Sequence, residues 1–590
     1  MRHTPSSRWF AAIAVAVLTT SLASCQQHAA GPPFDPRGTM QSVAMLLEQD
    51  HISRHPLDDE VSRQAFAALF DELDPMRLFF LQDDVDGYRP EADRLDDYVR
   101  AGDPAFADEV HALLERRVRE ASALALQQLE QSPDFTRDES ISTDTETLAF
   151  AATPTELAER WRQRVKLDRL RLEFSGVPAD DIAGRLRRRY ERMTLESATP
   201  ERAVTELLDA ITGVYDPHTT YFAPRTAADF AMMIRLNYEG IGALLGDDDG
   251  RIVVRKLLRG GSAIAAGTLA AGDVILAVGN DDDGELEPID GMPIDDVVDR
   301  IRGPRGTSVR LQVSTGGAPP RIVTLERRKT ELQDQLASGE VVEAGSARIG
   351  WIDLPGFYAD PDGSRSATAD VARLLRDFQD QGVSAVVLDL RENGGGLLSE
   401  AVSLTGLFLR GGNVVRVRDT DGQTRRFDDP DDGALWSGPL VVLTSRFSAS
   451  ASEILAGAIQ DDGRGLVVGD TATHGKGSVQ TVVDLGEHPL HRGDHPSGAL
   501  KLTTQQFFRP GGDSTQLHGV AADIVLPAWT EAVAEGEAAL PHALPFRAIA
   551  PLVGGVTPAR DPRLVERLAA ASAGRVAADP GFVAVEQHNR

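Results

Sequence analysis

Three alternate serines, Ser448, Ser450 and Ser452, stand at the start of a helical pattern. They follow an apolar run, residues 440–444, that is typical of a buried strand. A serine at such a junction is well placed as a nucleophile, because the first main-chain N–H groups of a helix have no partner within it. The N–H of Ala451 could in this way hold an oxyanion. The same serines could instead be plain N-caps, which are common where helices begin.

A lysine and a run of glycines supply what a nucleophilic serine needs. The loop Gly475-Lys476-Gly477 follows a short apolar run, and its glycines let the backbone approach a neighbour while the amine turns inward. Upstream, the strand-like residues 385–390 lead to Gly394-Gly395-Gly396, whose uncovered N–H groups suit the second donor of an oxyanion hole. Together these stretches predict a nucleophile, a base and an anion site.

Two residues compete for the role of the base. A solvated lysine amine, with a pKa near ~10.4, is protonated at neutral pH, but burial lowers that pKa and makes the amine a usable base. Serine–lysine pairs are a known variant of the serine triad. Alternatively, Ser450, Asp461 and His474 follow the chain order of an α/β-hydrolase triad, although no G-x-S-x-G elbow surrounds Ser450. The sequence favours Lys476 over His474.

The combination of these motifs resembles the carboxyl-terminal processing proteases, and within them the tail-specific proteases of bacterial periplasms. The matching stretches are residues 448–453, 460–461, 464, 475–477, 479–480 and 389–396. The resemblance implies a serine–lysine dyad with Ser450 as nucleophile, Lys476 as general base and Gln480 holding the lysine amine. Asp461 falls where the family has an aspartate. Two features depart from the family pattern. His474 stands where the family usually has a phenylalanine before Gly-Lys-Gly, and the loop 469–476 is one residue longer than in the family.

Composition narrows the classes of partner and cofactor. The chain has 590 residues, room for several domains, and a formal net charge of −29, which argues against nucleic acid as a partner. No His, Cys, Asp and Glu residues are grouped at metal-ligand spacing, so we expect no metal and no cofactor. The single cysteine, Cys25, excludes an internal disulfide.

The context of Cys25 predicts a lipid anchor. Two arginines and a short apolar stretch, residues 9–18, form a signal segment too short to span a bilayer. Leu22-Ala23-Ser24-Cys25 then matches the bacterial lipobox, which implies cleavage before Cys25 and lipidation of its sulfur. An ordinary secretory signal is the alternative. Gln26 is not the aspartate that retains lipoproteins in the inner membrane, so the resemblance implies an outer-membrane lipoprotein facing the periplasm.

Changes of pattern divide the chain into regions and predict an α+β multidomain protein. Apolar residues at helical spacing precede short strands with turns, and strand–helix alternation, typical of an α/β layer, follows. The family resemblance specifies a crotonase-like or Clp-protease-like serine protease core, with residues 500–508 and 516–520 as closing strands. The expected regions are a lipoprotein signal peptide (1–24), a linker (25–38), an N-terminal helical domain (39–235), a PDZ domain (236–330), the protease core (331–530) and an abbreviated C-terminal helical region (531–590).

The second region contains a loop that resembles the carboxylate-binding loop of PDZ domains, formed by Gly240, Ile241, Gly242 and Ala243. Successive N–H groups of the last three can form a nest for a chain-terminal carboxylate, and the peptide then adds as a strand at the sheet edge. A Gly-x-Gly sequence alone is more often a plain turn. The Leu-x-x-Gly-Asp-x-Ile pattern that begins at Leu269 makes the resemblance specific.

The resemblance therefore implies a periplasmic serine endopeptidase that recognises apolar C-terminal tails of proteins through its PDZ domain. Its partners would be such proteins, the membrane through the lipid anchor, and a lipoprotein adaptor of the kind that some relatives use. Two other classes remain as alternatives: a non-catalytic PDZ peptide-binding scaffold, and a small-ligand carrier on the same core. Both are disfavoured because Ser450 and Lys476 are both present.

Overall fold

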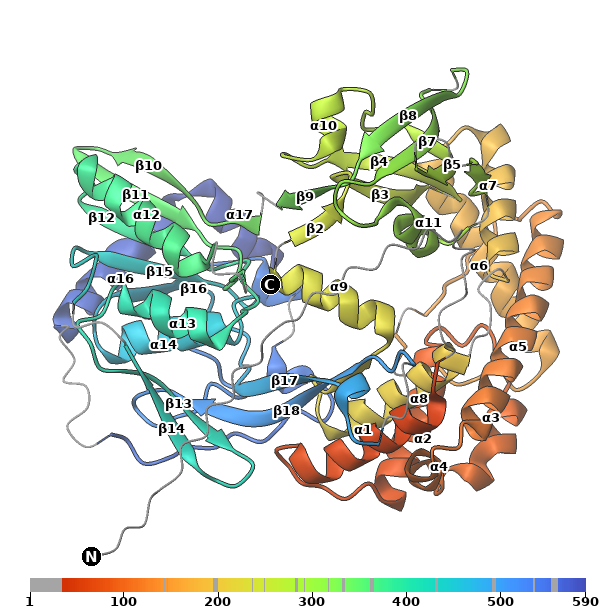
Figure 1. Ribbon diagram of the computed structural model, residues 1–590, viewed down its shortest axis with the longest axis horizontal. Helices are drawn as coiled ribbons and strands as arrows, with labels where there is room; N and C mark the ends of the chain where they lie inside the picture. The colour runs from red at the N-terminus through yellow and green to blue at the C-terminus, as the bar shows by residue number, and fades with distance from the viewer. Residues whose placement is uncertain are drawn as a thin grey trace, which may run out of the picture.

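The computed structural model describes residues 34–589 with short gaps, and the expected signal peptide and Cys25 lie outside this part. The gaps are 143, 146, 195–199, 236, 249, 282–284, 291, 317, 332–334, 361–364, 430–432, 491–494, 534–535 and 553–560. Figure 1 shows the N-terminal helices at the right, the PDZ-like region at the upper right, and a parallel sheet with its helices at the left. Helix α9 (Pro224–Arg235) lies between them.

The N-terminal region is helical, as predicted. Several of its helices begin at strong capping residues: Asp58 accepts from two main-chain N–H groups at the start of α2, and Thr153 precedes Pro154 at the start of α6. The apolar faces of the helices form two cores: one takes in Leu500 and Leu502 of strand β18, and the other contains Leu157 and Trp161 of α6. The elements are α1 (Pro36–Asp50), α2 (Asp59–Leu73), α3 (Gln82–Tyr88), α4 (Leu95–Ala101), α5 (Ala105–Leu129), α6 (Pro154–Phe174), α7 (Ala179–Arg192), α8 (Pro200–Tyr215) and β1 (Thr220–Phe222).

The PDZ-like region is an antiparallel sheet in the order β3-β4-β5-β7-β8, with β3 at an edge. A ribbon of β2 (Asn237–Gly240) and β9 (Arg328–Glu331) connects it to the rest of the chain. Helix α11 (Ile294–Ile301) packs on the sheet through Val297 and Ile301. The other elements are β3 (Ala243–Asp248), β4 (Arg251–Leu257), α10 (Ser262–Ala266), β5 (Val274–Asn280), β6 (Glu287–Pro288), β7 (Ser308–Ser314) and β8 (Arg321–Glu326).

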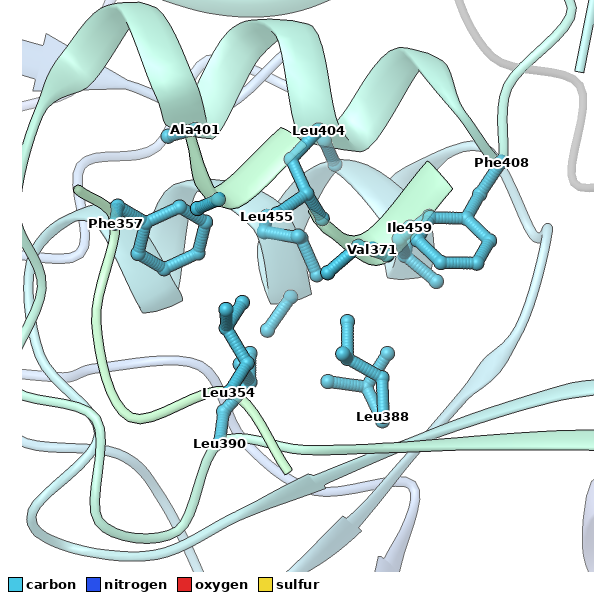
Figure 2. Close-up of a cluster of buried hydrophobic side chains, with 14 of the residues drawn as sticks. Leu354, Phe357, Val371, Leu388, Leu390, Ala401, Leu404, Phe408, Leu455 and Ile459 are labelled. Carbon is cyan, nitrogen blue, oxygen red and sulfur yellow. The ribbon is translucent and has the colours of Figure 1, made fainter. Parts of the chain in front are cut away.

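Strand–helix alternation builds the predicted α/β layer. The sheet has the order β10-β11-β12-β15-β16-β19, antiparallel at β10 and parallel elsewhere. Apolar side chains of three helices meet the strand residue Leu388 and the neighbouring Leu390 and Leu354 in the core that Figure 2 shows. The elements are β10 (Ser338–Ala344), β11 (Ala347–Asp353), α12 (Ala367–Asp380), β12 (Ala385–Asp389), α13 (Leu398–Gly406), β15 (Leu440–Thr444), α14 (Ala451–Asp461), β16 (Leu466–Gly469) and β19 (Ile524–Val525).

A second, antiparallel sheet ties the helical region to this core. Strand β18 (Ala499–Phe508) pairs with β1 of the helical region, with β13 (Asn413–Asp419) and with β17 (Ser478–Asp484), and β13 pairs with β14 (Thr424–Asp428). The expectation of a closing strand over 516–520 is wrong. Leu517 and Gly519 have φ of 67° and 68°, so the chain turns there instead of extending.

The C-terminal region is helical, with α15 (Thr530–Val533), α16 (Pro562–Ala578) and α17 (Pro580–His588). Asp561 and Asp579 cap the last two helices, each before a proline. Across the described ranges, no helix is both long and apolar enough to cross a bilayer. The α+β multidomain class expected from the sequence is confirmed.

Candidate active site

Ser450 begins α14 in a strained conformation. Its φ of 55° and ψ of −109° lie where residues other than glycine rarely occur, and such strain clusters at functional sites. The hydroxyls of the two neighbouring serines are engaged: Ser448 donates to the Leu390 carbonyl and Ser452 to the Asn393 carbonyl, each at 2.8 Å. Both serines are buried, whereas Ser450 lines a cavity. The structure therefore distinguishes the middle serine from its neighbours.

The cavity beside Ser450 has a volume of about 1240 Å³ and is lined by separate parts of the chain. The loop after β12 contributes Gly394, and the loop before β17 contributes Lys476. Strands β17 and β18 contribute Gln480 and Lys501. Helix α9 adds a wall of mostly apolar side chains: Ala227, Ala228, Phe230, Ala231, Met233 and Ile234. The fold thus brings the predicted nucleophile, base and glycine loop to one cavity.

The main chain around Lys476 is fixed at every peptide group of Gly475-Lys476-Gly477. The N–H groups of Gly475 and Lys476 donate to the Glu453 carboxylate at 2.7 and 3.0 Å, and that of Gly477 donates to Gln516 Oε1 at 2.8 Å. The three carbonyl oxygens accept, in chain order, from Leu517 N–H at 2.7 Å, the Thr515 hydroxyl at 2.8 Å and Phe507 N–H at 2.9 Å. The loop therefore holds the lysine Cα in one place.

The environment of Lys476 favours the neutral amine. Burial, together with the nearby charge of Lys501, lowers the pKa of Lys476 to about 8. Three carboxylates, Glu537, Asp216 and Glu453, act in the opposite direction and are outweighed. Lys501 is itself a partly buried lysine whose pKa is lowered by desolvation. At mildly alkaline pH a large fraction of Lys476 can therefore accept a proton.

Gln480 lines the same cavity, and its carboxamide is held in place by hydrogen bonds from its nitrogen. Nε2 donates to the hydroxyls of Ser478 and Thr503, each at 3.0 Å. The hydrogen bonds seen for Gln480 do not include the amine of Lys476, so the structure places these two residues in one cavity without joining them. Oε1 remains the acceptor that a lysine amine could use.

The glycine loop after β12 lies directly against the nucleophile. A Cβ on Gly395, whose φ is 116°, would stand 3.0 Å from the Ser450 Cβ, so only glycine allows this approach. The Gly395 N–H, however, donates to the Asn393 side chain at 2.9 Å, which engages one of the predicted oxyanion donors. Gly394 borders open space, and Ala451 occupies the first turn of α14. These two remain the candidate oxyanion donors.

Asp461 does not belong to the site, which corrects the assignment of this residue to the catalytic set. It ends the 11-residue helix α14 that Ser450 begins, so about 15 Å of helix separates the two. Its carboxylate pairs with Arg509 and accepts from the Gly511 N–H. Asp461 therefore fixes the C-terminal end of α14, and a Ser450–His474–Asp461 triad cannot form.

His474 lies next to the base loop but points to other partners. Its ring Nδ1 is 3.7 Å from the carboxylate of Glu537, and burial lowers the pKa of the imidazole. Glu537 also accepts a hydrogen bond from Gln516 and contacts His218 at 2.8 Å. His474 is not among the residues that line the cavity of Ser450. The geometry thus favours Lys476 as the base.

The predicted peptide-binding loop borders a second cavity, of about 560 Å³. Gly240, Ile241, Gly242 and Ala243 line it together with helix α11, next to the free edge of β3. Gly242 has φ 71°, and a Cβ on the facing Gly261 would stand 2.7 Å from the Gly242 Cα, so this loop needs its glycines. The cavity can accommodate an extended peptide beside β3.

Three residues that shape the site carried no function in the sequence analysis. Glu453, fully buried, holds the base loop, and Asn393 fixes the glycine loop. Lys501 brings a second amine to the cavity. A glutamate at the third position of a helix that begins with serine is the signature of a capping box, which could have indicated Glu453. The partners of the other two depend on contacts between distant segments.

Models of three protein families match consecutive parts of the chain. Residues 43–225 match the tail specific protease N-terminal domain, residues 232–314 match the PDZ domain, and residues 348–526 match peptidase family S41. Fold and site therefore define a serine-type peptidase that carries a PDZ domain.

Relatives identify the family more closely. The tail-specific protease of Haemophilus influenzae is 36% identical over 92% of this chain and 77% of its own length. The carboxy-terminal-processing protease of Bartonella bacilliformis is 32% identical over 59% of this chain and 74% of its own. Among solved structures, the photosystem II D1 C-terminal processing protease is 30% identical over 58% of this chain and 86% of that chain, with a TM-score of 0.33. The chain belongs to the tail-specific and carboxy-terminal processing proteases.

Proposed function

We propose that this peptidase cleaves proteins of the cell envelope with a Ser450–Lys476 dyad and selects them by an apolar C-terminal tail. The observation that carries the proposal is the shared cavity of the strained Ser450 and the partly buried Lys476, whose pKa is lowered to about 8. Neither Ser448 nor Ser452 has a free hydroxyl, and Asp461 lies at the far end of α14.

The dyad would act in two half-reactions. The neutral amine of Lys476 takes the Ser450 hydroxyl proton as Oγ attacks the scissile carbonyl, and the oxyanion is held by the N–H groups of Ala451 and Gly394. The ammonium then protonates the leaving amine, which gives an acyl-enzyme. Water attacks this ester after giving its proton to Lys476, and Ser450 is released with its proton restored. Gln480 Oε1 orients the amine throughout.

The PDZ cavity supports the selection of tails. An extended C-terminal segment would add to the edge strand β3, with its carboxylate on the N–H groups of Ile241, Gly242 and Ala243. Ile294 and Val298 of α11 and the half-exposed Leu244 give this cavity apolar surface. Apolar tail side chains are therefore the class that it suits.

The proposal places the enzyme on the periplasmic side of the envelope, anchored through Cys25 to the outer membrane and open to a lipoprotein adaptor. The lipobox residues 22–25 support the anchor. A non-catalytic PDZ scaffold is the alternative that the experiment must exclude.

Digestion of one model substrate separates these possibilities. The wild type should cleave a protein with an apolar tail and spare the same protein with a charged tail, and Ser450→Ala should cleave neither. The Ser452→Ala variant is the matched control and should retain cleavage. Cleavage by Ser450→Ala would contradict the assigned nucleophile, and loss of all tail dependence would contradict the selection step.

A further inference from the structure

The nucleophile and the base are joined by a single buried carboxylate. Oε2 of Glu453 accepts the main-chain N–H of Ser450 at 2.7 Å and that of Lys476 at 3.0 Å. Oε1 accepts the N–H of Gly475 at 2.7 Å and the hydroxyl of Thr473 at 2.6 Å. These donors come from two segments, the start of α14 and the loop before β17. The His474 N–H also joins the two segments, by donating to the Ser448 carbonyl at 3.0 Å, but Glu453 is the partner that Ser450 and Lys476 share.

Two features show that the hydrogen bonds to Glu453 fix the position of Ser450 relative to the loop of Lys476. Ser450 has φ 55° and ψ −109°, a conformation that persists only where surrounding contacts impose it, and the bond from its own N–H is one such contact. The Glu453 side chain is fully buried, and within the described chain no cation pairs with it. The four hydrogen-bond donors named above therefore take the place of water around its carboxylate.

We infer that Glu453 is a positioning residue of the peptidase: its carboxylate holds the strained Ser450 and the loop of Lys476 in one register, and so sets the distance between nucleophile and base. This inference rests on the proposed dyad. It also gives Glu453 an electrostatic effect: burial raises the pKa of this carboxyl to about 7, and above that pH its negative charge lies beside the lysine that must lose a proton.

The pH dependence of turnover separates this role from simple structural support. The titratable groups that act on the charge of Lys476 come from several elements. They are Glu453 on α14, Lys501 on β18, Asp216 after α8, Glu537 in the C-terminal region and His474 on the loop of Lys476 itself. The anion of Glu453 raises the pKa of Lys476 against the stronger effects of burial and Lys501. Its removal should therefore move the acid limb of the turnover profile to lower pH.

Glu453→Gln is the direct test, because the amide has the size of the carboxylate but places an N–H2 group against main-chain donors. We expect kcat to fall about tenfold to a hundredfold, with KM for a tailed peptide unchanged and with the acid limb at lower pH. The rate at which a fluorophosphonate labels Ser450 should fall by the same factor. Glu400→Gln is the matched control: Glu400 is a buried carboxylate of the same core that serves Thr368, and its loss should leave kcat unchanged.

If Glu453→Gln does not purify as folded protein, Glu453→Asp replaces it; the shorter side chain keeps the charge, so kcat should fall without movement of the acid limb. A folded Gln or Asp variant with kcat within about twofold of the wild type would overturn the inference. So would a rise in KM alone, or an equal loss in Glu400→Gln. Cleavage by Ser450→Ala or Lys476→Ala would refute the dyad itself, an outcome that differs from all of these.

Discussion

Asp216, at the end of the helical region, accepts a hydrogen bond of 3.0 Å from the hydroxyl of Thr503 on strand β18. The same hydroxyl accepts from the Gln480 carboxamide, so the helical region is linked by hydrogen bonds to the cavity of Ser450. Asp216 is fully buried and also contacts His51 at 2.8 Å. Burial opposes its ionisation, but the hydrogen bonds and charge of His51 and the other donors outweigh this and lower the pKa of Asp216 to about 2. The N-terminal helices are therefore part of the support of the active site.

Substitution of Asp216 should lower both stability and turnover. Asp216→Asn places amide hydrogens against buried donors, which costs about 1–3 kcal/mol of unfolding free energy, and it releases Thr503 from its position under Gln480. Denaturant unfolding and kcat measure the two effects. Asp421→Asn, which breaks only an exposed pair with Arg54, is the control and should change neither. An unchanged unfolding midpoint in Asp216→Asn would show that the hydrogen bonds of Asp216 contribute nothing to the free energy of unfolding.

Turnover should rise with pH through the ionisation of Lys476. The neutral amine is the active form, so kcat should increase up to a midpoint near pH 8 and level off above it. Lys501→Met removes a neighbouring charge that disfavours protonation, so the midpoint should move to higher pH. A profile of kcat from pH 6 to 10 tests both statements. A flat profile, or a midpoint that Lys501→Met leaves in place, would contradict this account of the base.

Amidation of a substrate's terminal carboxylate should slow its cleavage. The loop at Ile241, Gly242 and Ala243 offers main-chain N–H groups to that carboxylate, and a charge-assisted contact of this kind contributes about 1.5–3 kcal/mol, roughly tenfold to a hundredfold in kcat/KM. The comparison needs one peptide in its free-acid and amidated forms. Equal rates for the two would remove the PDZ cavity from the selection step.

Replacement of the lipobox cysteine should change where the protein is found. Cys25→Ser removes the only sulfur that can carry the lipid, so the variant should appear in the soluble periplasmic fraction while the wild type stays with membranes. Fractionation with mass spectrometry of the N-terminus provides the measurement. A soluble wild type that starts after Cys25 without lipid would mean that the signal is an ordinary secretory one.

The sequence predicted those strands and helix starts that depend on residues close together in the chain. Apolar runs that alternate with helical spacing predict the parallel strands, and the junction before α14 predicts three candidate serines, of which the family resemblance selects Ser450. The family resemblance predicts a strand over 516–520, but the conformation of this segment depends on a contact with a distant loop, in which the Leu517 N–H donates to the Gly475 carbonyl. The length of α14 alone could have excluded Asp461 from the site.

The parts of the site that sequence could not supply depend on contacts between distant segments. Glu453 becomes important only when the loop of Lys476 folds over α14, 23 residues further along the chain. The glycine run predicts Gly395 as an oxyanion donor, but the side chain of Asn393 accepts its N–H in the folded protein. Asp216 and Lys501 come together with Lys476 through the pairing of β1 and β17 with β18, and which strands pair depends on segments that lie far apart in the sequence.

Lys476, and not His474, is proposed as the base for Ser450. The most direct measurement is kcat for Lys476→Ala and His474→Phe on one tailed substrate, beside the wild type. Lys476→Ala should lose several orders of magnitude in turnover, and Lys476→Arg should be equally inactive because guanidinium stays protonated. His474→Phe should keep most of the activity, since His474 lies outside the cavity. An active Lys476→Ala together with an inactive His474→Phe would contradict the dyad.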